Sequence, residues 1–237
     1  MNRKIVKRAI GTLLIIGGSL FILSYFAREW VVEKKVAETT KNYSLLNRKE
    51  LKINNEKDVA FKNEEIEDIS IFTGLKSSLE DVSGNIVGKI VIPSLDIDLP
   101  LLKGTTNANL HAGATTMRDD QRPGEGNYPI AGHIMPNKRL LFGSLMDISN
   151  GAMVYITDKE RVYEYQIYET ELVPDTAMYM IEDKRARLEG SPIVSLMTCY
   201  YSSKSGKRFF ATGRLVRNFP IEDIDKFLSV EVKGELE

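Results

Sequence analysis

An uncharged apolar stretch close to the N-terminus is the feature that most limits the fold. It runs from Ala9 to Ala27 as AIGTLLIIGGSLFILSYFA and follows a short segment, 3–8, that contains four basic residues. As a helix of about 19 residues it would be about 28 Å long, close to the hydrocarbon thickness of a bilayer. The sequence therefore predicts one N-terminal transmembrane helix.

The residues on either side of this stretch indicate an uncleaved anchor and its orientation. A signal peptide ends in small residues before its cleavage site, whereas Tyr25 and Phe26 stand near the end of this apolar run. Basic residues keep the N-terminal flank in the cytoplasm, and Tyr25 and Trp30 suit the opposite membrane interface. We therefore expect a single-pass protein of the cell membrane, with the rest of the chain on the extracellular face.

Composition divides the chain into four segments. Residues 1–29 are expected to form a cytoplasmic tip and the anchor. Residues 30–82 are rich in Lys, Glu and Asn and contain no proline, which predicts a charged, partly helical juxtamembrane stalk. The alternative is that these helices are an integral part of the folded domain. Residues 83–219 are expected to form that domain, and residues 220–237 a C-terminal tail.

The segment 83–219 carries about eight short runs with strand-like composition. Examples are IVGKIVIP, MVYITD, VYEYQIYETELV and RFFATGRLV, which are rich in β-branched or aromatic residues. Long helical patterns are few. These features predict a mainly β fold, a closed β-barrel of about eight strands with short helices. The 32 basic and 33 acidic residues nearly cancel, so we expect no nucleic-acid partner.

Cys199, the only cysteine of the chain, ends the apolar run PIVSLMTC. In an exported domain a single cysteine cannot form an internal disulfide, so it is either a buried, inert side chain or a chemically active thiol. An active thiol needs a base or a positive charge nearby, and a donor that stabilises the oxyanion formed when it attacks a carbonyl. Other parts of the sequence must supply these groups.

Few residues fit these roles. The histidines are His111, in a turn-like stretch, and His133, which closes the strand-like run YPIAGH. If RFFATGRLV pairs as an antiparallel strand with IVSLMTC, its first residue, Arg208, lies opposite Cys199. On spacing alone either histidine could be structural, and Arg208 competes with Lys207, Arg214 and Arg217. The sequence has no cysteine pair and no closely spaced histidine pair that would indicate a metal site.

Several of these motifs together resemble one known family. SLMTC followed by KRFFATG resembles the signature of the sortases, with Ser195 in place of the usual first threonine. VGKIVIPSLDIDLPLLKGTT, HAGATTM and GEGNYPIAGHIM are similar to earlier parts of the sortase domain, above all in class A. The motifs cover residues 85–217 in the family's order, and their combination is much more specific than any one of them.

The resemblance implies a sortase β-barrel over 83–219 and the activity of a cysteine transpeptidase of Gram-positive bacteria. It implies that Cys199 is the nucleophile, His133 the general acid and base, and Arg208 the residue that binds the oxyanion and the substrate. His111 falls where the family has no catalytic histidine. The implied reaction cleaves a Leu-Pro-x-Thr-Gly sorting signal between Thr and Gly through a thioester on Cys199. It then joins the secreted protein to an amine of the peptidoglycan precursor.

The apolar part of such a signal needs an apolar groove. By position in the family pattern, the groove is expected to be lined by Leu110, Met117, Ala131 and Met197, with Thr198 as a helper beside Arg208. The alternative for the four apolar residues is a place in the core. The segment 174–192 matches the long loop that closes over the Leu-Pro part of the signal, and its candidate contacts are Met178, Met180 and Ile181.

Some class A sortases bind calcium through acidic residues before the histidine strand and in the long loop. Here the first of these loops reads MRDDQRPGEG, in which Arg118 and Arg122 interrupt the carboxylates. A hard dication needs several convergent oxygens. We therefore expect no cofactor, with a calcium ion as the alternative that stays open.

Three other functions stay open at this point. One is a sortase of class B or D with a different sorting signal, because TCYYSSKSGKRF is not the commonest class A loop. A second is a secreted cysteine protease that only hydrolyses peptides. The third is a non-catalytic extracellular β-barrel scaffold in which Cys199 is inert. The variable residue of the signal, the acceptor amine and the client proteins are not encoded in these patterns.

Overall fold

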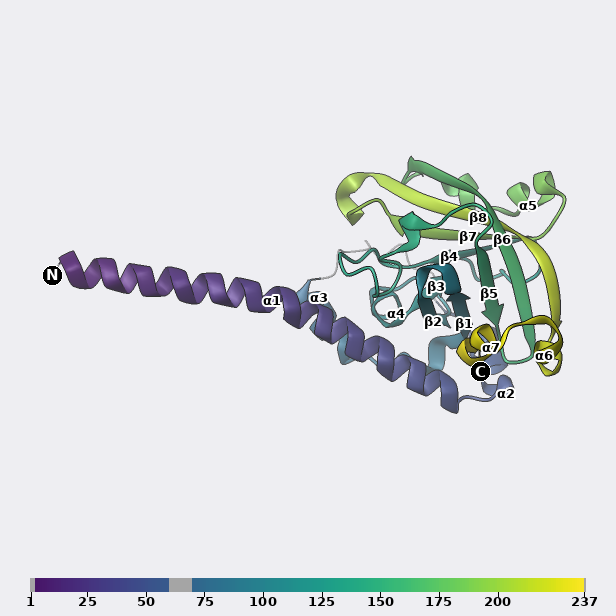
Figure 1. The fold of residues 1–237 in the computed structure, drawn as a ribbon, viewed down its shortest axis with the longest axis horizontal. Helices are drawn as coiled ribbons and strands as arrows, with labels where there is room; N and C mark the ends of the chain where they lie inside the picture. The colour runs from purple at the N-terminus through teal and green to yellow at the C-terminus, as the bar shows by residue number, and fades with distance from the viewer. Residues whose placement is uncertain (1–2, 60–69, 237) are drawn as a thin grey trace.

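A computed structural model describes residues 3–59 and 70–236 of the chain. Eight strands close into one barrel in the order β1-β2-β3-β4-β7-β8-β6-β5, and a long helix, α1, projects from it (Figure 1). The predicted mainly β barrel with short helices is thereby confirmed. The strands are β1 (Ile86–Ile92), β2 (Ile97–Leu102), β3 (Ala114–Thr116), β4 (Asn127–Ala131), β5 (Met153–Thr157), β6 (Arg161–Pro174), β7 (Ile193–Cys199) and β8 (Lys207–Pro220).

Short helices cover the barrel and connect its strands. Besides the long α1 (Arg3–Leu45), the α-helices are α2 (Arg48–Glu56), α3 (Ile71–Ser78), α4 (Asn107–Ala112), α5 (Asp183–Glu189), α6 (Ile224–Phe227) and α7 (Val230–Leu236). A short 3-10 helix, η4 (Met178–Ile181), precedes α5 between β6 and β7. The segment predicted as a long loop thus contains two short helices that pack beside the barrel.

The strands that matter most for the site are buried on both faces. Ile130 of β4 and Leu196 of β7 belong to the main core inside the barrel. Because side chains alternate along a strand, Ala131 and Met197 leave on the opposite face, where they join a second apolar cluster. Burial on both faces explains why β4 and β7 read as nearly continuous apolar runs.

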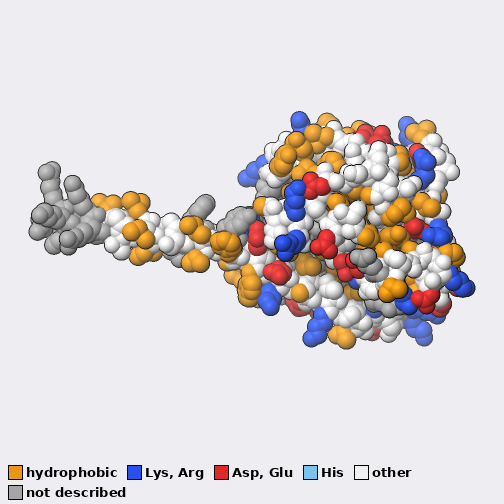
Figure 2. Space-filling view, viewed as in Figure 1, with side chains coloured by type: hydrophobic (Ala, Val, Ile, Leu, Met, Phe, Trp, Pro, Cys, Tyr) orange, Lys and Arg blue, Asp and Glu red, His pale blue; other side chains and the backbone are white. Residues whose placement is uncertain are grey.

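Helix α1 is much longer than the predicted membrane span. Its part from Ile10 to Leu45 forms 36 residues of helix that are long and apolar enough, by length and composition, to cross a membrane. In Figure 2 the N-terminal part stands away from the globular part and exposes hydrophobic side chains. The side chain of Tyr25 lies outside the described residues, so its place at the membrane interface stays a prediction.

The C-terminal part of α1 packs on the barrel. Tyr43 is buried, and Lys35 Nζ donates a hydrogen bond to the Glu80 carbonyl at 2.7 Å. Lys159, between β5 and β6, donates through Nζ to the carbonyls of Tyr43 (2.8 Å) and Leu46 (2.7 Å). These bonds lie at a helix end, where carbonyls have no partner within the helix. This part of the predicted stalk therefore contacts the domain, as in the alternative given for it, while the domain boundaries themselves stay predictions.

The segment predicted as a C-terminal tail also contacts the barrel. Ile224 of α6 and Leu236 of α7 are buried in a cluster with Val91 and Tyr155, which come from β1 and β5. Apolar residues of the segment 220–236 thus cover the outside of the barrel on this side.

Candidate active site

A parallel strand pair brings His133 and Cys199 together. In the register of β4 and β7, Ala131 is the partner of Met197, and Gly132 N donates a hydrogen bond to the Met197 carbonyl at 3.0 Å. Each chain then continues by two residues, to His133 and to Cys199. Because residues two apart in extended chain share a face, we infer that the imidazole and the thiol leave the sheet on the same side.

Arg208 reaches the same place from a third strand. β8 pairs antiparallel with β7, and Cys199 and Arg208 are directly opposite each other at the end of that ladder. β4, β7 and β8 are neighbours in the barrel. The strand pairing expected from the sequence is therefore confirmed, and it gathers an imidazole, a thiol and a guanidinium at the adjoining ends of three strands.

The side chains of His133 and Cys199 are shielded from water, and one hydroxyl joins their two chain segments. Cys199 is 6% exposed and His133 is 4% exposed.

Thr198 is fully buried and donates its Oγ1 hydrogen to the Gly132 carbonyl at 2.8 Å. This bond joins β7 to the chain just before His133. The contact of Thr198 with substrate stays a prediction. Holding Gly132 is a role that the sequence did not suggest.

His111 lies next to His133, which the sequence did not indicate. The two rings are tilted, with centroids 5.3 Å apart. His111 Nδ1 lies 2.5 Å from the Asn107 carbonyl, and because a carbonyl only accepts, Nδ1 carries the hydrogen. Burial lowers the pKa of His111. In its neutral form His111 places no positive charge beside the His133 ring.

An apolar cluster adjoins these groups on the same face of the sheet. Ala131 and Met197 precede His133 and Cys199 by two residues each, and Phe210 follows Arg208 by two. The four residues predicted to line a groove, Leu110, Met117, Ala131 and Met197, all belong to or pack on this cluster, together with Val173, Met180, Phe210, Ala177 and Ile181. Met178 is 61% exposed and lies outside it. Contact of any of these residues with substrate stays a prediction.

The Arg208 guanidinium contacts a backbone carbonyl and, at a longer distance, one carboxylate. Its Nη1 donates to the Lys207 carbonyl at 3.0 Å, and its Nη2 lies 3.9 Å from Asp175 Oδ2 at the end of β6. Two of the competing cations have carboxylate partners away from Cys199, since Arg214 pairs with Glu189 and Arg217 with Glu164. Of these three arginines, the strand register places Arg208 opposite the thiol.

Several carboxylates of the two loops that could hold calcium are paired with cations. Arg118 binds Asp183 through two hydrogen bonds of 3.0 and 3.1 Å, and Asp119 pairs with Lys103 at 2.7 Å. The hydrogen bonds from Arg118 lower the pKa of Asp183. No group of three His, Cys, Asp or Glu residues that could hold a metal occurs among the described residues. As paired here, Asp119 and Asp183 do not present convergent oxygens to a cation, and the expected absence of a cofactor stays a prediction.

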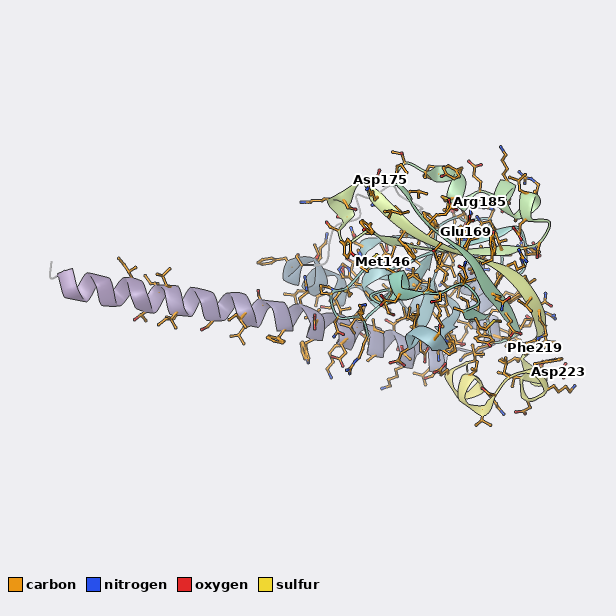
Figure 3. The ribbon with its side chains drawn as sticks, turned by 45° about the horizontal axis from the view of Figure 1, so that its top comes forward. Met146, Glu169, Asp175, Arg185, Phe219 and Asp223 are labelled. Atoms are coloured by element: carbon orange, nitrogen blue, oxygen red, sulfur yellow. The ribbon has the colours of Figure 1, made fainter. Side chains whose placement is uncertain are left out.

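The Arg118–Asp183 pair joins the loop before β4 to the η4–α5 segment. Asp183 also accepts a hydrogen bond from Asn127 N (2.9 Å) in β4. Arg185 of α5 adds a second attachment, to Glu169 (3.1 Å) and Glu171 (2.8 Å) of β6 (Figure 3). Bidentate arginine–carboxylate pairs are among the stronger hydrogen-bonded contacts in proteins. The segment over the apolar cluster is thus fixed by side chains of this chain.

Replacing Arg118 by alanine is expected to loosen the η4–α5 segment. Loss of charge-assisted hydrogen bonds costs about 1.5–3 kcal/mol, which would raise tryptic cleavage after Lys184 and Arg187 by about tenfold or more. Limited proteolysis followed by mass spectrometry measures this rate. Arg122→Ala, in the same loop and exposed, is the matched control. Equal cleavage of both variants, or protection of the native chain only when calcium is added, would contradict the expectation.

Comparison with known proteins identifies the family. The family model described as the Sortase domain matches residues 90–216, which is more than half of the chain. The chain belongs to the sortase family. It is therefore a sortase, a cysteine transpeptidase, and the fold class and family expected from its motifs are confirmed.

Curated relatives support the same assignment. Sortase A of Listeria monocytogenes is 38% identical over 212 residues, covering 89% of this chain and 91% of the relative. Sortase A of Bacillus anthracis is 29% identical over 222 residues, covering 91% and 97%. Sortase D of Bacillus subtilis is 24% identical over 147 residues, covering 60% and 69%. The similarity is thus stronger to these relatives named sortase A than to this sortase D.

A solved structure agrees with the fold of this sortase. The crystal structure of Listeria monocytogenes sortase A has a TM-score of 0.55 and 38% identity, and it covers 64% of this chain and 97% of that one. The departure from the family motif at Ser195 is accommodated within the barrel wall. Ser195 Oγ donates to Asn127 Oδ1 at 2.9 Å, which links β7 to β4.

Proposed function

We propose that this sortase cleaves a Leu-Pro-x-Thr-Gly sorting signal between Thr and Gly and transfers the cleaved protein to an amine of the peptidoglycan precursor. The observation that carries the proposal is the meeting of His133, Cys199 and Arg208 at the ends of three adjacent strands. An apolar cluster suited to Leu and Pro side chains adjoins them.

The reaction has two acyl-transfer steps. In the first, the Cys199 thiolate attacks the Thr carbonyl carbon and gives a tetrahedral oxyanion. Protonated His133 donates its proton to the glycine nitrogen, the carbon–nitrogen bond breaks, and a thioester remains on Cys199. In the second, the incoming amine attacks the thioester carbon and gives a proton to neutral His133. The new amide forms as the Cys199 thiolate leaves, and the charges of the starting state return.

Arg208 has the role of stabilising the oxyanion. A guanidinium presents a planar fork of hydrogen-bond donors, which suits a carbonyl oxygen that gains negative charge. Its side chain is partly buried, with 17% exposure, and low local dielectric strengthens this interaction. Shielding of the site from water also favours the amine over hydrolysis of the thioester.

The proposed location is the outer face of the cell membrane, with α1 as the single anchor. Basic residues before the apolar stretch and the length of α1 support this topology. The proposed partners are secreted proteins that carry a C-terminal sorting signal, and the peptidoglycan precursor. Both substrates would then meet the enzyme on the side of the membrane where the wall is assembled.

The test uses the full chain in detergent micelles with a quenched Leu-Pro-Glu-Thr-Gly peptide, with and without triglycine. Cleavage after Thr, with triglycine joined to the new end by mass spectrometry, is the expected result. Cleavage whose product does not change with triglycine would indicate a hydrolase. No cleavage, together with no alkylation of Cys199 by iodoacetamide, would favour the inert scaffold. If Cys199 is alkylated but the peptide is not cleaved, the result would indicate a different sorting signal.

A further inference from the structure

Helix α3 exposes an apolar face that no described part of the chain covers. Phe72 is 82% exposed, Leu75 55% and Leu79 83%. Their spacing of three and then four residues places them on one side of the helix. Single exposed apolar residues are common on protein surfaces, but a row formed by two residues of α3 and the Leu79 that caps it is a candidate contact surface.

Helix α3 lies beside the part of α1 that follows the predicted span, and the side that carries Gly74 faces α1. The Cβ position of Gly74 is 3.6 Å from Val31 Cγ1, and Lys35 donates to the carbonyl of Glu80, just after α3. The two helices therefore run in the same direction, with the first turn of α3 nearest the membrane end. Figure 1 shows α3 beside α1 where that helix leaves the barrel.

The height of α3 above the hydrocarbon follows from the helix rise. The predicted span ends at Ala27, and Val31 lies four residues further along α1. At about 1.5 Å per residue, Val31 and the neighbouring Gly74 are about 6 Å beyond the span, while each headgroup layer is about 5–7 Å thick. Phe72 and Leu75 are at this level, and so is Trp30, which is 59% exposed. Aromatic residues are enriched at this depth.

We propose that Phe72 and Leu75 insert into the headgroup layer of the phospholipid leaflet from which α1 emerges. This inference rests on the membrane anchor of the proposed function and is independent of its chemistry. A single span leaves a domain free to tilt and to rotate about the helix axis. A second, apolar contact to one side of that axis limits the tilt, because tilting the domain away from that side would pull the apolar side chains into water.

The orientation favoured in this way points the active site at the membrane. Asn137, four residues after His133, donates through Nδ2 to Glu29 Oε2 of α1 at 3.3 Å. The segment after His133 thus contacts α1 at Glu29, two residues beyond the end of the predicted span. Asp175, the neighbour of Arg208, also lies on the side of the barrel from which α1 projects (Figure 3). A membrane-borne acceptor or sorting signal would then reach Cys199 without leaving the membrane surface.

The test places a single tryptophan at chosen depths in the full chain, reconstituted in vesicles of phosphatidylcholine and phosphatidylglycerol. The native tryptophan is removed by Trp30→Phe in every variant. Phe72→Trp reports on the face of α3. Leu14→Trp, in the span, reports on the anchor, and Leu188→Trp, 79% exposed on α5 at the far side of the barrel, is the matched control. Each variant is compared in plain lipids and in lipids with brominated acyl chains, which quench nearby tryptophan.

For Phe72→Trp, bromination is expected to lower emission by about twofold, as for a side chain at the headgroup boundary. Emission of Leu188→Trp should not change. Quenching of Leu14→Trp without quenching of Phe72→Trp would overturn the inference and leave the anchor intact. Absence of quenching in both would overturn the anchor and the inference together. Emission of Phe72→Trp that is blue-shifted but not quenched would mean that protein, such as a second copy of the chain, covers this face.

Discussion

Replacing Cys199 by serine is expected to reduce transfer of the peptide to triglycine by at least about 10⁴-fold. A serine hydroxyl is far less acidic than a thiol, so the nucleophilic anion is almost absent at neutral pH. The substitution keeps the size and burial of a side chain that is 6% exposed. The fold should therefore be retained, and circular dichroism and thermal unfolding check this.

The acyl-enzyme gives a second, direct readout of the same prediction. When peptide is added without an amine, the native enzyme should gain the mass of the acyl fragment, and the adduct should disappear with hydroxylamine, as a thioester does. Cys199→Ser should show no adduct. An unmodified native chain that still forms product, or a serine variant that transfers at a rate near that of the native enzyme, would exclude Cys199 as the nucleophile.

The parts of the fold and site that could be predicted are those that leave a local pattern in the sequence. Strands such as β7 and β8 have apolar, β-branched or aromatic runs with turn residues between them, and their antiparallel pairing fixes Arg208 opposite Cys199. The roles of Cys199, His133 and Arg208 came from the resemblance of these motifs to sortases. Spacing alone did not decide which cation lies beside the thiol or whether either histidine is catalytic.

The missed features are contacts between residues that are distant in the chain. Lys159 binds carbonyls at the end of α1, more than 100 residues away, and nothing near Lys159 in the sequence indicates this partner. His111 meets His133 because α4 lies next to the end of β4 in three dimensions. Arg118 was seen only as an obstacle to calcium, whereas the structure pairs it with Asp183. Such pairings depend on tertiary packing, which periodicity and composition do not encode.

Replacing Arg208 by lysine is expected to lower kcat/KM for the peptide by about 10²–10³-fold, the usual effect of losing an oxyanion donor. The variant keeps the positive charge, so the measurement isolates the planar fork of donors, which an ammonium cannot reproduce. If Arg208 acted only through its positive charge, Arg208→Lys would keep a nearly normal kcat/KM. The Asp175 contact, at 3.9 Å, is too long to hold the guanidinium away from a substrate.

Arg214→Lys is the matched control for this variant. Arg214 lies on the same strand, and its side chain is 52% exposed and pairs with Glu189 rather than facing Cys199. Its replacement removes the same chemical group from β8 and should leave kcat/KM nearly unchanged. Similar losses in both variants would indicate a general effect on β8. Near-normal turnover of Arg208→Lys would show that other donors stabilise the oxyanion. The position of Arg208 opposite Cys199 would then serve the pairing of β7 and β8 and not catalysis.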